Sequence, residues 1–195
     1  MTREEAWELL CRWVQSPALR RHLLGVEAAM RAYARRLGGD PDLWGLAGLL
    51  HDLDYERHPS QEAGHPYRGA EALQAAGAPP EVVRAVLAHA DYTGVTRETP
   101  MEKALFACDE LVGFLIAVAL SRPGRTIAEV DVPAVLKKLK EKAFARGVNR
   151  EELRRGAAEL GVPFEKHIQV VLEALQAEAP ALGLAGEASV PPGSG

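Results

Sequence analysis

The sequence has few cysteines and no long apolar run, and both absences limit the classes of protein that it can encode. Its 195 residues include only two cysteines, Cys11 and Cys108, and neither lies in a CxxC pattern. No apolar run reaches the roughly 18 residues that a membrane-spanning helix needs. The first ten residues, MTREEAWELL, lack a cationic segment followed by an apolar one. We therefore expect a soluble, cytoplasmic protein with reduced thiols and no membrane contact.

The charge balance shows no basic excess. The formal net charge is −4 at pH 7, and the isoelectric point is near 5.9. Proteins that wrap duplex DNA or coat an anionic membrane need clustered positive charge, so we expect no DNA partner. Small polar substrates remain open. With 47% hydrophobic residues, a chain of this length can form one domain with a sizeable core.

The sequence also lacks the two-residue alternation of half-buried strands, and it shows no long internal repeat. Helix starts, by contrast, are easy to place. A capping residue followed by proline occurs at Ser16-Pro17, Asp40-Pro41 and Thr99-Pro100, and each pair predicts the first turn of a helix. The expected fold is all-α, a single globular bundle of about eight helices with short connections.

The domain boundaries follow from composition. We expect one helical domain over residues 1–177, with a motif-bearing core at about residues 16–120 and additional C-terminal helices over 126–177. From Pro180 the sequence reads PALGLAGEASVPPGSG, which is rich in Pro, Gly, Ala and Ser. Such a segment has little to bury, so residues 178–195 are expected to form a flexible tail.

The residues that stand out chemically are His51 and Asp52, which directly follow the apolar run LWGLAGLL. A carboxylate in a core position is costly unless it pairs, takes a proton or binds a metal. His22, His89 and Asp109 also lie on apolar helical stripes and should face inward. Each of these residues, taken singly, is better explained as a hydrogen-bonded core residue. Taken together, the imidazoles and carboxylates on several predicted helices are more easily satisfied by a divalent ion than by one another.

The order of these residues carries a family resemblance. His22, then His51-Asp52, then Asp109 resembles the H…HD…D signature of the HD-domain metal-dependent phosphohydrolase superfamily. The stretches LAGLLHDLDYE and ALFACDELVGF are similar to its predicted HD-superfamily hydrolase branch, which is related to the HDIG proteins. The resemblance implies an HD-domain-like helical fold in which these four residues are metal ligands. His65 and His89 fall where two-metal members supply further histidines, so it also allows a second ion.

The chain departs from the family pattern in three places. The His-Asp-Ile-Gly tetrad of some members reads His51-Asp52-Leu53-Asp54, and the GYP extension of the cyclic-dinucleotide phosphodiesterases is absent. The adjacent histidine pair of those enzymes is replaced by His89-Ala90. These differences argue against hydrolysis of cyclic di-GMP and leave the substrate undefined.

The ligand types limit the choice of metal and chemistry. Imidazole and carboxylate without thiolate suit Mn²⁺, Fe²⁺, Co²⁺, Ni²⁺ or Zn²⁺, and Mg²⁺ suits a carboxylate-rich position. The resemblance predicts a phosphohydrolase acting on a small phosphorylated molecule, a nucleotide or related phosphomonoester, with one ion expected and two possible. Asp52 is the expected catalytic ligand. Asp54 can orient water or act as a general base, although a surface carboxylate near a helix end is the simpler explanation.

Three arginines are candidates for binding the substrate phosphate. Arg68 lies close to His65 in the sequence, and Arg122 and Arg125 follow the helix that carries Asp109. Guanidinium groups bind phosphate through paired hydrogen bonds, although most surface arginines are only solvated. Two other functions stay open. The chain can be a regulatory module that binds metal or nucleotide without turnover, or a helical scaffold whose His and Asp residues form a hydrogen-bonded core.

Overall fold

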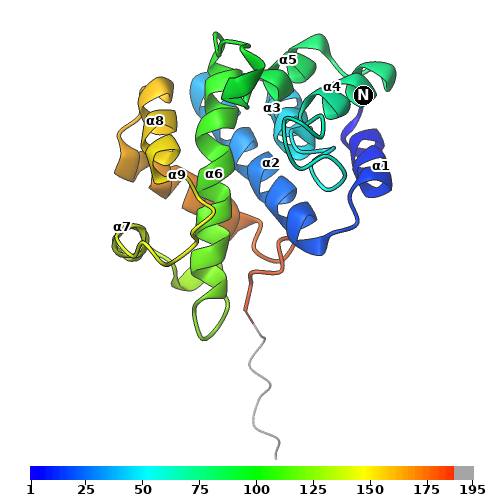
Figure 1. The fold of residues 1–195 in the computed structure, drawn as a ribbon. Coiled ribbons are helices and arrows are strands. Elements are labelled where there is room, and N and C mark those ends of the chain that lie inside the picture. The colour runs from blue at the N-terminus through cyan, green and yellow to red at the C-terminus, as the bar shows by residue number, and fades with distance from the viewer. Residues whose placement is uncertain (187–195) are drawn as a thin grey trace, which may run out of the picture.

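The computed structural model describes residues 1–186, which form nine α-helices, two short 3-10 helices and no sheet (Figure 1). The α-helices are α1 (Arg3–Trp13), α2 (Pro17–Leu37), α3 (Pro41–Leu50), α4 (Tyr67–Ala75), α5 (Pro80–Ala88), α6 (Pro100–Leu120), α7 (Val132–Leu139), α8 (Arg150–Leu160) and α9 (Phe164–Ala177). The 3-10 helices are η1 (Asp91–Thr93) and η2 (Ile127–Glu129). The all-α prediction is confirmed. Within residues 1–186, no helix has the length and apolar character needed to cross a membrane.

Helix starts lie where the local sequence predicts them. The side chains of Ser16 and Asp40 cap α2 and α3, each with proline at the next position. Thr99 and Glu102 form a reciprocal capping box at the start of α6. Caps satisfy N–H groups that have no partner in the first turn, so they fix a boundary without help from tertiary contacts.

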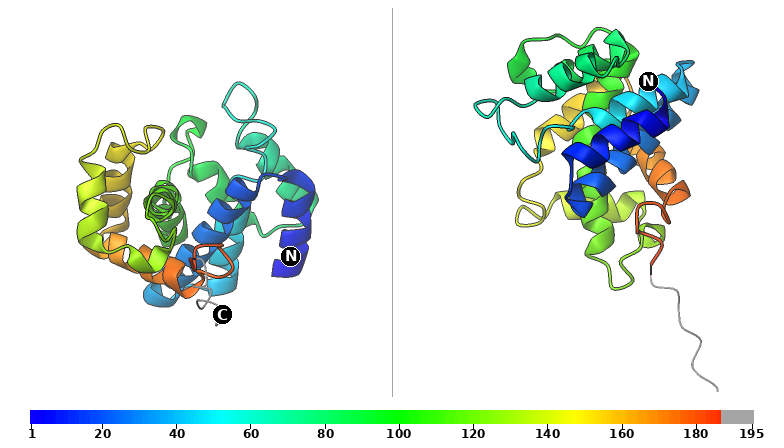
Figure 2. Two further views of the ribbon diagram at one scale, coloured as in Figure 1. Left: turned by 90° about the horizontal axis from the view of Figure 1, so that it is seen from below. Right: turned by 90° about the vertical axis from the view of Figure 1, so that its right-hand side faces the viewer.

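Helix α6 lies at the centre of the molecule. Figure 2 shows it end-on, with α7 and α8 on one side and α2 on the other. Leu105, Leu111 and Phe114 of α6 are completely buried. A helix that is apolar on all faces is stable only when other elements surround it. Asp109, on this helix, is therefore a polar residue that the fold brings close to the interior.

Helices α2 and α3 approach closely through Gly48. A Cβ atom built on Gly48 would lie 2.8 Å from the carbonyl oxygen of Val26 and 2.9 Å from the backbone nitrogen of Glu27. Only glycine permits that backbone contact. It brings the end of α3, with His51, beside the face of α2 that carries His22, and the two imidazole centroids lie 5.4 Å apart.

The chain after α9 packs on the helices as far as residue 186, although a flexible tail was expected from residue 178. Leu182 and Leu184 are buried, and Nε of Arg21 donates to the carbonyl oxygen of Leu182 over 2.8 Å. These two leucines supply apolar contacts that the Pro- and Gly-rich composition of the segment concealed. Residues 187–195, the rest of the expected tail, lie outside the described residues.

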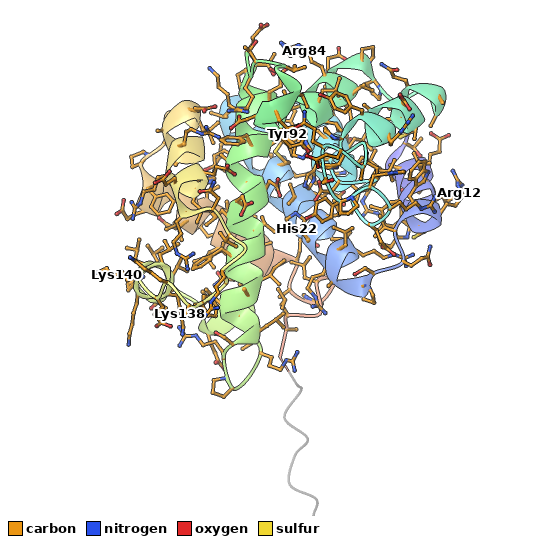
Figure 3. The ribbon with its side chains drawn as sticks, in the orientation of Figure 1. Arg12, His22, Arg84, Tyr92, Lys138 and Lys140 are labelled. Carbon is orange, nitrogen blue, oxygen red and sulfur yellow. The ribbon has the colours of Figure 1, made fainter. Side chains whose placement is uncertain are left out.

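The lysines of α7 lie far from the centre of the fold. Figure 3 shows Lys138 and Lys140 at the outer edge of the molecule and His22 near its middle. The ammonium group of Lys138 pairs with Glu141 over 2.8 Å and lies 4.9 Å from the ring centroid of Phe144. This basic helix therefore serves local contacts and does not reach the histidine cluster.

Candidate metal centre

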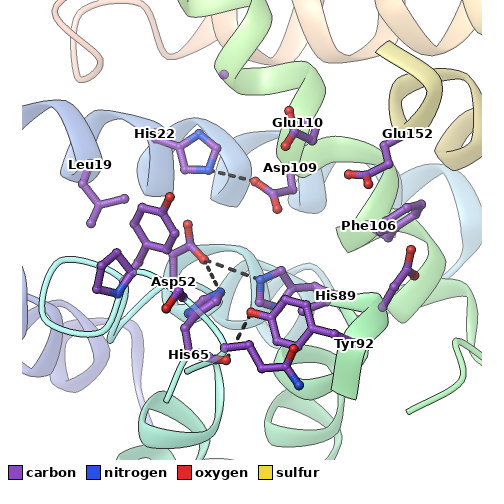
Figure 4. A pocket seen from close by; sticks show the side chains of 17 residues that line it. Leu19, His22, Asp52, His65, His89, Tyr92, Phe106, Asp109, Glu110 and Glu152 are labelled. Carbon is purple, nitrogen blue, oxygen red and sulfur yellow. Dashed lines mark hydrogen bonds and ion pairs between the residues drawn. The ribbon is translucent and has the colours of Figure 1, made fainter. Parts of the chain in front are cut away.

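The predicted metal ligands come from separate segments and meet at one place (Figure 4). Their ligand atoms form two groups that share one carboxylate, and within each group the atoms lie within 4.8 Å of one another. The first group is His22, His51 and Asp52, and the second is Asp52, His65 and His89. Asp109 adjoins the first group, with Oδ1 3.0 Å from Nε2 of His22. The His-Asp doublet lies just beyond α3, in the turn that follows Leu50, rather than within the helix.

Backbone carbonyl groups fix two of the imidazole rings. Nδ1 of His51 donates to the carbonyl oxygen of Gly48 over 2.9 Å, and Nδ1 of His89 donates to that of Val86 over 2.5 Å. A carbonyl oxygen can only accept, so Nδ1 carries the ring hydrogen in both residues. Each Nε2 atom is left for another partner. Histidines that bind a metal through Nε2 are held in this way.

Asp54 fixes a third ring, that of His65. Its Oδ1 accepts from Nδ1 of His65 over 2.7 Å, and its Oδ2 accepts from the backbone N–H of Gly69 over 2.7 Å. Asp54 is completely buried and does not line the cavity described below. This position differs from both readings of the sequence, since Asp54 neither lies on the surface nor faces a place where substrate could react. It lies behind a predicted ligand and orients it.

The free Nε2 atoms face carboxylate oxygens. Nε2 of His51 lies 3.3 Å from Oδ1 of Asp109, and those of His65 and His89 lie 3.4 and 3.5 Å from Oδ1 of Asp52. The Nε2 atom of His51 is buried and makes no hydrogen bond within the described residues. A neutral imidazole nitrogen and a carboxylate oxygen both present lone pairs, which repel unless a proton or a cation lies between them. The donor set and its geometry therefore fit divalent metal ions.

The electrostatics of the cluster agree with this fit. Burial by itself would raise the pKa of Asp109, but the facing His51 and His22 outweigh burial and hold that pKa well below its usual value. Burial by itself would lower the pKa of His51, but the charges of Asp52 and Asp109 raise it to about 9. In the absence of a metal ion, His51 therefore carries a second proton, on Nε2, and is a cation at neutral pH. That proton occupies the place where a metal would bind.

A cavity of about 610 Å³ opens in front of the cluster. Asp52 and Asp109 line it, so both carboxylates can reach a molecule bound inside. Tyr55 and Tyr92 also line it, and each is 43% exposed. The hydroxyl of Tyr92 donates to the backbone carbonyl of His65 over 3.1 Å, which ties this tyrosine to the ligand segment. Neither tyrosine had a sequence signal that marked it as a site residue.

Three further carboxylates line the cavity: Asp91, Glu110 from α6 and Glu152 from α8 (Figure 4). Burial, together with the charges of Asp109 and Glu152, raises the pKa of Glu110 to about 7. Glu152 accepts from the side-chain amide of Asn149 over 2.7 Å. Sequence reasoning missed Glu152, because its only local signal is its place in the first turn of a helix.

The three arginines predicted to bind phosphate lie away from this cavity, and none of them lines it. The side chain of Arg68 is 57% exposed and pairs with Glu71 over 2.9 Å. Arg122 and Arg125 follow the end of α6, roughly 20 Å from Asp109 along the helix axis at about 1.5 Å per residue. The geometry therefore does not bring these guanidinium groups to the predicted ligands.

Residues 19–112 match the family model described as HD domain. This segment is similar to HD domains. It contains every predicted metal ligand, from His22 to Asp109, and Asp54 as well. HD domains typify a superfamily of metal-dependent phosphohydrolases, and the His and Asp cluster is compatible with such a metal site. No curated protein and no solved structure matches the chain significantly.

Proposed function

We propose that the chain is a metal-dependent phosphohydrolase acting on a small phosphomonoester, such as a nucleotide. The observation that carries the proposal is the buried Nε2 atom of His51, which makes no hydrogen bond within residues 1–186 and faces Asp109. A buried imidazole nitrogen that faces a carboxylate needs a proton or a cation between the two, and a divalent ion would take the place of that proton. The match to the HD family supports the same chemistry.

The ligands divide into two sets. His22, His51, Asp52 and Asp109 form the first, and Asp52, His65 and His89 form the second, so Asp52 would bridge two ions if both sets are filled. The absence of thiolate favours Mn²⁺, Fe²⁺, Co²⁺, Ni²⁺ or Zn²⁺, with Mg²⁺ as the harder alternative. An ion held by these residues would polarise a phosphoryl group and lower the pKa of a bound water.

The protein's own contribution is to hold the donor atoms in place. Gly48 and Val86 fix two rings through their carbonyl groups, and Asp54 fixes His65. Because each Nδ1 is anchored, the rings present Nε2 without having to rotate when an ion arrives. Asp52 belongs to both sets and also lines the cavity, so we assign it the catalytic position next to the reacting phosphate. Asp54 is a positioning residue.

The cavity suits a small organic phosphate. Its volume of about 610 Å³ falls within the range of small-molecule sites, which is roughly 300–1,000 Å³. Tyr55 and Tyr92, both partly exposed, offer apolar ring faces to a planar group such as a nucleobase. A nucleoside monophosphate therefore has a place for its phosphate at the carboxylate and imidazole cluster and a place for its ring against the tyrosines.

Phosphate release tests the proposal. Protein loaded in turn with Mn²⁺, Co²⁺, Ni²⁺, Zn²⁺ or Mg²⁺ is assayed against nucleoside monophosphates and other phosphomonoesters. We expect turnover with at least one ion, and a loss of about 100-fold or more in Asp109→Asn, because a ligand of the first set is removed. Asp42→Asn is the matched control, since the Asp42 side chain is 88% exposed and outside the cluster, and its rate should equal that of the wild type.

The alternative function gives a different result in the same experiment. Binding of metal and nucleotide without phosphate release, across all the ions, would favour a regulatory module that uses the HD fold. A protein that binds neither metal nor nucleotide would contradict both functions and leave the hydrogen-bonded scaffold.

A further inference from the structure

The cavity wall carries several carboxylates and, among the described residues, no lysine or arginine. Among the described residues that line it are the carboxylates Asp91, Glu110 and Glu152, in addition to Asp52 and Asp109, and none is lysine or arginine. Sites that hold a chain of phosphates combine metal ions with several lysine or arginine contacts. In this cavity, positive charge for a phosphoryl group comes from the ions and histidines of the cluster and not from the rest of the wall.

Two guanidinium groups do contact the wall, but carboxylates already engage them. Nη1 of Arg97 donates to Oδ1 of Asp91 over 2.8 Å, and its Nε donates to Oε2 of Glu159 over 2.8 Å. Arg155 pairs with the other oxygen of Asp91. The Arg97 side chain is 10% exposed and lies 3.8 Å from the ring centroid of Phe106. These contacts neutralise Asp91, and neither arginine lines the cavity.

The first turn of α8 also reaches the wall, through Glu152. Free N–H groups at a helix start attract phosphate. Here the side-chain oxygen of Asn149 accepts from the N–H groups of Glu151 and Glu152 over 3.1 and 3.3 Å. Figure 4 shows the carboxylate of Glu152 turned toward the cavity. This helix start therefore offers a negative charge to the cavity instead of free donors.

We infer that the site accepts substrates with one phosphoryl group and rejects the matching di- and triphosphates, with Glu152 as a specificity-determining residue. The inference rests on the proposed function. A monoester places all its negative charge at the ions, whereas a triphosphate extends further charges along the wall that carries Glu152. Discrimination of this kind comes from repulsion of the wrong ligand as much as from attraction of the right one.

The test compares the monophosphate and triphosphate of one nucleoside, in excess Mn²⁺ so that the triphosphate does not strip metal from the protein. Both kcat/KM and the equilibrium Kd from calorimetry are measured for each nucleotide. The wild type should prefer the monophosphate by about tenfold or more, because the extra charges meet a like-charged wall. Higher salt should reduce that preference, because it screens the repulsion.

Two isosteric variants isolate the effect of Glu152. Glu152→Gln removes the charge from the wall and should reduce the preference about three- to tenfold, the effect of one partly screened charge. Glu151→Gln removes a charge from the same helical turn, but Glu151 is exposed and does not line the cavity. The Glu151→Gln variant should therefore prefer the monophosphate over the triphosphate as strongly as the wild type does.

The outcomes separate this inference from the proposed function. A wild type that takes the triphosphate as well as the monophosphate overturns the inference, as do equal changes in Glu152→Gln and Glu151→Gln. Binding of neither nucleotide also overturns it. If neither nucleotide is hydrolysed but the binding preference and its dependence on Glu152 hold, the inference stands and the proposed hydrolysis fails.

Discussion

Asp54 accepts a hydrogen bond from Nδ1 of His65 over 2.7 Å, and this buried contact decides which ring nitrogen of His65 faces the cavity. The other oxygen of Asp54 accepts from the N–H of Gly69 over 2.7 Å. Two donors thus converge on one carboxylate, one from the segment before α4 and one from the first turn of α4. The second ligand set depends on this pair, although Asp54 itself is behind the site.

Replacing Asp54 with asparagine should disturb the second ligand set first. An amide has one oxygen, so its NH₂ group would face either His65 or Gly69, both of which are donors. We expect a stability loss of about 1–3 kcal/mol and a metal affinity at the second set lower by about 10–100-fold. Calorimetric titration with Mn²⁺ measures the affinity, with Asp42→Asn as the control. Unchanged binding in Asp54→Asn would show that Asp54 does not act through His65.

Metal uptake should release protons. The pKa of His51 is raised to about 9, because the attraction of Asp52 and Asp109 outweighs the effect of burial. The metal-free protein therefore holds a proton on Nε2 of His51 at pH 7. Because a nitrogen that binds a metal must be unprotonated, metal binding displaces this proton. Affinity should rise about tenfold per pH unit between pH 7 and pH 9 for each proton displaced. Titration in two buffers of different ionisation enthalpy counts the protons, and a count of zero would contradict the role given to His51.

A second histidine, His167, should make the free energy of unfolding depend on pH in a lower range, between pH 6.5 and pH 4. His167 is buried, its Nε2 donates to the carbonyl of Ala107 over 2.9 Å, and its Nδ1 contacts the hydroxyl of Tyr33. Burial lowers its pKa from 6.5 to about 4. Between these values the unfolded chain binds a proton at this residue and the native protein does not, so acid favours unfolding. The contribution of His167 to the free energy of unfolding should therefore fall by roughly 3 kcal/mol between pH 6.5 and pH 4.

The variant His167→Gln isolates that contribution. It should be less stable than the wild type at pH 7, because the two hydrogen bonds of His167 are weakened or lost. The difference in free energy of unfolding between the two proteins should narrow as the pH falls toward 4.5, because the variant has no imidazole at this position to take up a proton on unfolding. Urea unfolding of both proteins in chelator, at several pH values, measures this difference. A difference that stays constant with pH would mean that His167 is not held neutral in the fold.

Gly48 should tolerate no side chain. Alanine there would place Cβ 2.8 Å from the carbonyl oxygen of Val26, a backbone atom that cannot move alone. We expect Gly48→Ala to lower the free energy of unfolding by about 2–4 kcal/mol. Gly147→Ala is the control, because nothing lies within 4 Å of its added Cβ. Thermal unfolding compares the two, and equal midpoints would show that α2 and α3 can separate freely.

The parts of the fold that the sequence predicted are those determined by neighbouring residues. Ser16-Pro17, Asp40-Pro41 and Thr99-Pro100 start helices as expected, because a cap and a proline act within a single turn. The packing of residues 178–186 could not be read in this way. Leu182 and Leu184 gain their burial from helices distant in the sequence, and composition alone gives no sign of that surface.

The same division applies to the site. His22 and Asp109 could be placed because each lies on an apolar helical stripe and matches a family signature. Arg122 was placed by its distance in sequence from Asp109, but a straight helix turns that distance into separation in space. Asp54 was misjudged because its partner, His65, approaches it only through the folded turn between them. Glu152 was missed because α8 meets the cavity through tertiary packing alone.

The central claim, that this His and Asp cluster holds metal, is tested most directly by elemental analysis of the protein purified without added metal or chelator. Wild type and Asp52→Ala are compared side by side, because Asp52 is shared by both ligand groups. The account predicts near-stoichiometric transition metal in the wild type and little or none in the folded variant. Wild-type protein that is free of metal, and stays so after incubation with Mn²⁺, Fe²⁺, Ni²⁺ and Zn²⁺, would contradict it.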